Sequence, residues 1–223
     1  MDWQAFQVSI SLALLTCLSL LPIGLALAYF LAKSTFIGRG FIEAIITLPL
    51  VLPPTVLGYF LLVGMDNNSF FGGLFVTLTG QSLAFSFVGL WFASLIYSLP
   101  FAVQPMLRSL ENIAPEIREA AWCSGLSRWK TFFKIELPLA WPGIITAMVL
   151  SFSHTLGEFG VVLMIGGNIA GETRTLSIAI YDSVLAFDHQ QAQTMSWILL
   201  SIALITISVV YTFNRQHVRL ARF

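Results

Sequence analysis

The sequence is poor in charged residues: Asp, Glu, Lys and Arg make up only 10% of its 223 residues, whereas 57% are hydrophobic. Roughly a quarter of a soluble domain is charged, so this composition indicates an integral membrane protein. The formal net charge of +0 argues against a nucleic-acid partner. No basic residue precedes the first apolar run, which is too long for a cleaved signal peptide, so we expect it to stay as a membrane helix.

Cysteine and histidine are scarce too. Cys17 lies in an apolar run and Cys123 in a polar one, so no disulfide between them is expected. A membrane enzyme needs catalytic side chains that converge, and His154, His189 and His217 fall in three separate regions. The sequence also lacks a G-x-x-x-x-G-K-[ST] phosphate loop. We therefore expect no enzyme activity and no metal or cofactor bound by this chain.

Long uncharged runs dominate the sequence instead. A membrane-spanning helix needs about 20 mostly apolar residues. The sequence predicts an all-α protein in which residues 1–223 form one transmembrane domain, with five spans near 7–32, 44–65, 84–106, 139–165 and 194–213. The segment "DNNSFFGGLFVTLTGQS" between the second and third spans is too polar and Gly-rich to cross. Residues 176–187, interrupted by Asp182, predict a surface or re-entrant helix.

Lysine and arginine are unevenly distributed over the connections between these spans. Cytoplasmic loops are enriched in Lys and Arg, and five spans place all of them except Arg174 on one side. This side holds Lys33, Arg39, Arg108, Arg118, Arg128, Lys130, Lys134, Arg215, Arg219 and Arg222. The sequence therefore predicts an external N-terminus and a cytoplasmic C-terminus.

The cytoplasmic connection at 107–138 contains a charged helical hairpin. Pro115 suits the first turn of a helix, Gly125 suits a left-handed C-terminal cap, and Ser127 can cap a second short helix. An exposed short helix of this kind fits a groove on another protein. The alternative is a loop that only covers the membrane surface.

The spacing of "EAA", a glycine four residues later and the "LP" after it resembles the EAA loop of permease subunits in ATP-binding-cassette (ABC) importers. In that family the loop docks in a cleft of a cytoplasmic ATPase. The resemblance implies the type I ABC importer permease fold. It assigns ATPase coupling to Glu119, Ala120, Ala121, Gly125 and Pro138.

Partners follow from the same resemblance. It implies two ATPase subunits that carry ATP–Mg, an extracytoplasmic oxyanion-binding protein, and a multi-pass location in the inner or plasma membrane of a prokaryote. Because five spans are few for enclosing a path, we expect a homodimer with the path on its two-fold axis.

Two further stretches narrow the family. "LPLVLPPTVLGYFLLV" (48–63) and "HTLGEFGVVLMIGGNIAGETRTLSIAIY" (154–181) resemble the permeases of molybdate importers, and sulfate and tungstate permeases share much of "GEFG" and "GNIAGET". The resemblance implies a tetrahedral oxyanion as cargo: molybdate first, with tungstate or sulfate/thiosulfate as the alternatives. A channel or secondary transporter without an ATPase is a remoter alternative, since intramembrane charges or inverted repeats would mark it.

No Lys or Arg lies within a predicted span, so we expect a path lined by neutral hydrogen-bond donors. The candidates for the path or its gate are Ser151, Ser153, Thr155, Gly157, Glu158 and Gly160 in the fourth span, with Pro53 and Pro54 in the second. Each hydroxyl has the alternative of bonding its own or a neighbouring helix. The prolines have the alternative of a static kink.

Glu158 is the only acid in the fourth span and is expected near its outer end. A carboxylate repels an anion, so we expect Glu158 to accept hydrogen bonds from a neighbouring helix end or subunit. His154, one turn earlier, is a candidate partner for it. On the outer side, Glu172 and Arg174 are candidate contacts for the binding protein, or form only a local pair with each other.

Overall fold

The computed structural model describes residues 1–220, and the chain is helical through most of that part. No β-strand occurs among these residues, and the predicted all-α class is confirmed. Some side chains used in the predictions lie outside the described part: Arg215, His217, Arg219 and Arg222.

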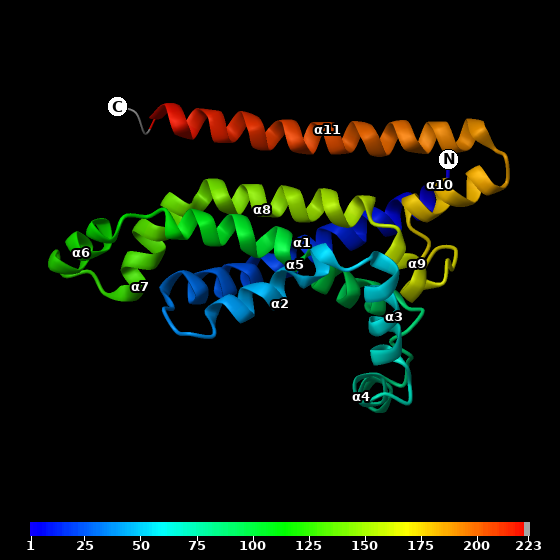
Figure 1. Cartoon of the computed structure of the whole chain (residues 1–223). Helices are drawn as coiled ribbons and strands as arrows, with labels where there is room; N and C mark the ends of the chain where they lie inside the picture. Colours follow the sequence, from blue (N-terminus) through cyan, green and yellow to red (C-terminus); the bar gives the residue numbers. More distant parts are fainter. Residues whose placement is uncertain (221–223) are drawn as a thin grey trace.

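Three long helices form the central bundle: α1 (Trp3–Lys33), α5 (Phe87–Glu111) and α8 (Leu137–Gly157). They make the most extensive contacts with one another and lie side by side in Figure 1. Small residues line their contacts: a Cβ on Gly143 would lie 2.3 Å from the Cβ of Ser109. Such residues let membrane helices approach closely, so this bundle is the framework on which the other elements are placed.

Among the described residues, four helices are long and apolar enough to cross a membrane: Trp3–Lys33, Phe87–Glu111, Arg128–Gly157 and His189–Val210. A fifth crossing needs α2 (Arg39–Val51) and α3 (Pro54–Met65) together, and these two helices are bent by 110° at their junction. The predicted span 44–65 therefore consists of two helices, and the prolines expected to kink or break it, Pro53 and Pro54, lie at their junction. Proline has no N–H to donate and breaks a helix, and Pro54 instead begins α3.

The predicted fourth span, 139–165, is also interrupted. The helix α8 ends at Gly157, Glu158 is extended, and the chain becomes helical again as α9 (Gly160–Gly166). At its other end α8 continues backward through a π-helical turn, η1 (Phe132–Glu136), into α7 (Arg128–Thr131). Because α5 also extends to Glu111, the connection predicted for 107–138 is helical at both of its ends.

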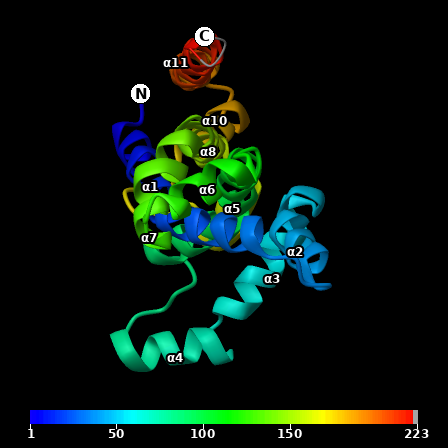
Figure 2. The same cartoon turned by 90° about the vertical axis from the view of Figure 1, so that its left-hand side faces the viewer.

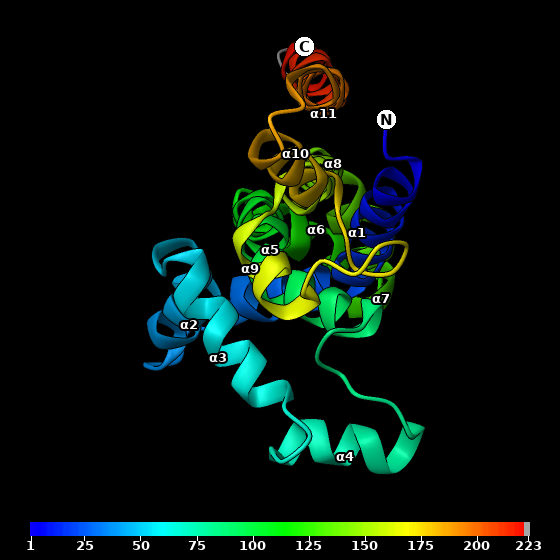
Figure 3. The ribbon, with the colours of Figure 1, turned by 90° about the vertical axis from the view of Figure 1, so that its right-hand side faces the viewer.

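The remaining helices surround the bundle. Figures 2 and 3 show α3 and the short α4 (Phe70–Thr79) projecting away from it. With 10 residues, α4 is too short to span a membrane, which agrees with the exclusion of 66–82. The long α11 (His189–Leu220) runs along α8 and follows α10 (Leu176–Leu185), the short helix predicted at 176–187.

Opposite ends of the bundle carry different elements, as Figure 1 shows. One end, which we call the hairpin end, carries α6 (Pro115–Cys123) and α7. The other, which we call the loop end, carries α9 and residues 167–175. The predicted coupling residues and the predicted outer contacts therefore lie at opposite ends of the molecule.

Candidate coupling hairpin and translocation elements

The hairpin forms as its sequence predicts. Pro115 is the first residue of α6, and Gly125 follows the helix with a φ of +81°, a conformation that glycine adopts without strain. The Leu126 N–H donates to the Ala121 carbonyl over 3.1 Å and closes the turn. The Ser127 hydroxyl then accepts from the Lys130 N–H and caps α7. The helix start, the glycine turn and the serine cap are confirmed.

The predicted coupling residues divide by environment. Glu119, Ala120 and Gly125 are exposed, whereas Ala121 is buried. Pro138 lies on another element, near the start of α8. The exposed surface of α6 also carries large apolar side chains, Ile117 and Trp122, which are 41% and 44% exposed. The projecting helix thus offers apolar anchors beside the small Ala120.

A buried ion cluster lies beneath this helix, and the sequence analysis missed it. Glu136, in the π-helical turn η1, is 1% exposed. Its Oε1 accepts hydrogen bonds from Lys33 Nζ of α1 and from Arg118 Nε of α6, each with a length of 2.5 Å. The available signal was an acid at the border of an apolar run, in "KIELPLAWPG". A carboxylate buried there needs a cationic partner.

The candidate hydroxyls of α8 face different neighbours. Ser153 bonds Thr206 of α11 over 2.9 Å, and Thr155 bonds Ser98 of α5 over 2.9 Å. Ser151 is fully buried, and its hydroxyl has no hydrogen-bond partner within the described part of the chain. These three side chains do not converge on one path within a single copy, and two of them bond neighbouring helices.

Glu158 caps a helix end. Its Oε1 accepts from the Val161 N–H at the start of α9 over 2.9 Å, and its carbonyl accepts from the Ser177 hydroxyl of α10. The expected bond to a neighbouring helix end is therefore present. The expected bond between Glu158 and His154 is absent among residues 1–220: His154 bonds Ser98 over 3.0 Å instead. The break after Gly157 explains this, because the two residues no longer share one helix.

The two helix breaks meet. A Cβ on Gly160 would lie 2.7 Å from the Cβ of Pro54, and one on Gly58 would lie 2.9 Å from the Cβ of Met164. Consequently α3 packs directly on α9, while Gly157 faces open space. The structure thus brings together Pro54, Glu158 and Gly160 from two of the predicted spans.

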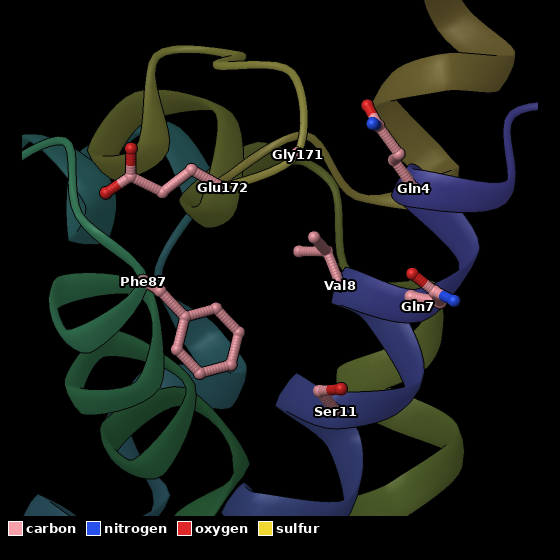
Figure 4. A pocket seen from close by; sticks show the side chains of 7 residues that line it. All are labelled: Gln4, Gln7, Val8, Ser11, Phe87, Gly171 and Glu172. Carbon is pink, nitrogen blue, oxygen red and sulfur yellow. The ribbon is translucent and has the colours of Figure 1, made fainter.

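A pocket of about 510 Å³ opens at the loop end between α1 and α5, and Figure 4 shows its lining. Gln4, Gln7 and Ser11 belong to α1, and Glu172 lies in the loop across the pocket from them, on the side of Phe87. The amides and the hydroxyl are neutral hydrogen-bond donors. Sequence analysis missed them, although their spacing of three and four residues places them on one helical face.

Arg174 is held within the chain. It donates to the Asn168 side chain over 2.8 Å and pairs with Asp182 at 3.3 Å and Asp2 at 3.6 Å. The alternative of a local Glu172–Arg174 pair is wrong for the described residues, since the partners of Arg174 are Asn168 in the same loop, Asp182 of α10 and Asp2 before α1. Within residues 1–220, no group of three or more His, Cys, Asp or Glu side chains is placed to hold a metal ion.

The described residues contain four helices of membrane-crossing length, and the bent α2–α3 pair meets the break after α8. These features define a multi-pass membrane protein with a charged hairpin at one end. Comparison with known families is more specific. The family described as "Binding-protein-dependent transport system inner membrane component" matches residues 21–222, and the chain belongs to this family.

Relatives match over nearly the whole chain. The molybdenum transport system permease protein ModB of Azotobacter vinelandii is 43% identical over 214 residues, which is 96% of this chain and 95% of the relative. ModB of Escherichia coli (strain K12) is 38% identical over 94% of this chain and 91% of its own length. The sulfate transport system permease protein CysT of the same organism is 32% identical over 86% of this chain and 69% of its own length.

Solved structures share the fold. A chain of the bacterial alginate ABC transporter, in complex with an alginate-pentasaccharide-bound periplasmic protein, matches 96% of this chain and 78% of its own length, with a TM-score of 0.73 and 19% identity. A chain of the inward-facing MetNI methionine ABC transporter matches 96% of this chain and 93% of its own length, with a TM-score of 0.67 and 16% identity. The chain therefore has the fold of ABC importer membrane proteins.

Proposed function

We propose that this chain is the membrane-spanning permease subunit of an ATP-driven importer of molybdate. The observation that carries the proposal is the 43% identity, over 96% of the chain, with a molybdenum transport permease. The sulfate permease is more distant, at 32% identity. Tungstate, sulfate and thiosulfate stay the alternatives, because they too are tetrahedral anions that neutral hydrogen-bond donors can hold.

In this proposal the hairpin end faces the cytoplasm and α6 docks on an ATPase subunit. The exposed Ile117 and Trp122 beside Ala120 support docking, because apolar anchors next to a small residue fit a groove on another protein. Glu119 and Gly125 complete the coupling segment. Two ATPase subunits supply the ATP–Mg, and this chain contributes no catalytic group.

The functional unit is a homodimer that receives its cargo from an extracytoplasmic binding protein. Large apolar side chains remain exposed on α3 and α4 of a single copy, which favours their burial against lipid or a second copy. They include Tyr59, Phe60, Phe70, Phe71 and Leu78. In this arrangement the loop end, with Glu172 and the pocket beside it, faces the binding protein.

The gate of the path is the place where the two broken helices meet. Pro54, Glu158 and Gly160 support this assignment, because an interrupted helix presents free backbone donors and can pivot. The carboxylate of Glu158 is engaged with the start of α9, so it stabilises the break and does not bind the anion. The neutral donors on the α1 side of the loop-end pocket suit an anion that must bind weakly and leave, and the acidic Glu172 in the same lining weakens the binding further.

The test is reconstitution of the complex in proteoliposomes with its ATPase and binding protein. We expect ATP-dependent uptake, with hydrolysis stimulated most by the molybdate-loaded binding protein. Stronger stimulation by tungstate, sulfate or thiosulfate would transfer the assignment to that anion. Uptake by the isolated chain without ATP would instead support a secondary transporter or channel.

A further inference from the structure

We infer that Glu136 is a positioning residue: together with its partner Arg118 it links the hairpin helix α6 to all three helices of the central bundle, so that movement of α6 reaches the transmembrane core. This inference rests on the proposed function, because it concerns how an importer transmits the motion of its ATPase. It assigns a role to a side chain that is not one of the EAA-loop residues Glu119, Gly125 and Pro138.

One carboxylate oxygen joins three elements. Oε1 of Glu136, at the start of α8, accepts from Lys33 at the end of α1 and from Arg118 in the middle of α6. The side chain of Glu136 is 2% exposed, and that of Arg118 is 14% exposed. Both groups are therefore largely withdrawn from water, where screening is weak and separation of the charges is costly.

Arg118 also reaches the third core helix. Its Nη2 donates to the Leu110 carbonyl of α5 over 2.9 Å. A single guanidinium thus contacts α5 and, through Glu136, both α8 and α1. No other side chain of α6 forms an ion pair or hydrogen bond with these helices in the described part of the chain.

Packing alone fastens α6 weakly. The helix packs mainly on α7, and most of its residues are exposed, Ala121 being its one buried residue. A helix held by so little apolar contact can move against the bundle unless something ties it down. The Arg118–Glu136 pair supplies this attachment, since it joins α6 to η1 through two charged groups that are largely withdrawn from water.

The π-helical turn places Glu136 for this task. In η1 the widened turn sets Phe132 and Glu136 toward α1, and both are buried. The ring of Phe132 packs edge-on against Tyr29 with centroids 4.8 Å apart, one helical turn from the Lys33 contact. Inserted π-helical turns often occur at functional sites. The apolar and ionic contacts together fix the junction of α7 and α8 on the end of α1.

The test measures molybdate uptake per ATP hydrolysed in proteoliposomes of the full complex. Arg118→Gln removes the tie to α6 but leaves the Lys33–Glu136 pair to hold the fold. We expect the transported anion per ATP to fall about tenfold, in line with the coupling energies of residues that link distant sites. Arg118→Lys, which keeps the cation, should recover most of the coupling.

The matched control is Glu111→Gln. Glu111 joins Arg39 of α2 and Arg108 of α5 in a second ion cluster that does not include α6. We expect its uptake per ATP to match the wild type, while an equal loss in Glu111→Gln would overturn the assignment. The ATPase should still co-purify with the Arg118→Gln variant. Loss of the complex would mean instead that Arg118 acts in docking itself.

Two outcomes separate the inference from the proposed function. A wild-type complex without ATP-dependent uptake would refute the importer and leave nothing to couple. If the wild-type complex transports and Arg118→Gln has unchanged uptake per ATP, only the role of Glu136 is refuted and the proposed function stands. Glu136→Gln leaves two cations facing a neutral amide, so this variant should be less abundant in the membrane than the wild type. Equal abundance would overturn the buried ion cluster on which the inference depends.

Discussion

Pro54 and Gly160 touch where the two interrupted helices meet, and a Cβ on Gly160 would lie 2.7 Å from the Cβ of Pro54. The Pro54 atom belongs to a ring and has no flexible end that can move aside. The absence of a side chain at Gly160 is therefore what lets α3 pack on α9. This contact ties the bent second span to the break after α8.

Gly160→Ala is expected to force α3 and α9 apart. Overpacking of this kind costs about 1–3 kcal/mol, so the protein should melt at a lower temperature and its uptake should fall several-fold. Thermal unfolding in detergent measures the first effect and proteoliposome uptake the second.

Gly157→Ala is the matched control for that variant. A Cβ on Gly157 meets nothing within 4 Å, so this change should leave melting and uptake near the wild-type values. Equal losses in both variants would show that helix flexibility, and not the contact with Pro54, is what matters.

Glu158 is expected to act as a helix cap through its carboxylate oxygen, and its negative charge is not expected to be needed. Glu158→Gln keeps an oxygen that can accept from the Val161 N–H and should retain most uptake. Glu158→Ala removes the acceptor and should cost about 0.5–2 kcal/mol of stability, the usual value of a helix cap. Melting temperatures of the two variants test this. Complete loss of uptake in a stable Glu158→Gln protein would contradict it and assign a role to the negative charge.

Ser98 is expected to stabilise the pairing of α5 with α8. Its hydroxyl bonds both His154 and Thr155, so Ser98→Ala should destabilise the protein by about 0.6–2 kcal/mol. Ser94 lies one turn away on the same helix and is buried, and its hydroxyl has no partner among the described residues. Ser94→Ala should therefore be neutral or stabilising. The melting temperatures of this pair decide whether the hydroxyl bonds or mere burial stabilise the interface.

Ala120 is expected to be a contact point for the ATPase. Because it is exposed, Ala120→Trp should insert and fold normally yet lose the co-purifying ATPase, and with it ATP-dependent uptake. Ala120→Ser keeps the small size and should retain both. A stable complex with the bulky variant would exclude docking through this face of α6.

The features that were predicted correctly from the sequence depend on short-range interactions. Pro115, Gly125 and Ser127 define the hairpin through a fixed φ, a left-handed turn and a cap, each of which depends on a few adjacent residues. Hydropathy found the apolar runs but could not find where a helix stops inside one. The break at Glu158 is stabilised by contacts with α9 and α10, which hydropathy does not register.

Pairings between distant residues could not be read from the sequence. Lys33 and Glu136 are 103 residues apart, and their contact depends on how α1 meets the start of α8. Arg174 likewise finds Asp2 and Asp182 and not the adjacent Glu172. A charged residue in an apolar run indicates that it has an oppositely charged partner, but the packing of the helices determines which residue that partner is.

The two thiols of the chain differ in accessibility in a way that is useful at the bench. Cys17 is buried in the bundle and its Sγ donates to the Met148 carbonyl, whereas Cys123 is exposed at the last residue of α6. A maleimide dye added to the folded, otherwise unaltered protein should therefore attach to the tip of the hairpin alone. In sealed inverted vesicles, a dye on Cys123 would report on which side of the membrane α6 lies and how far it is displaced as the ATPase turns over.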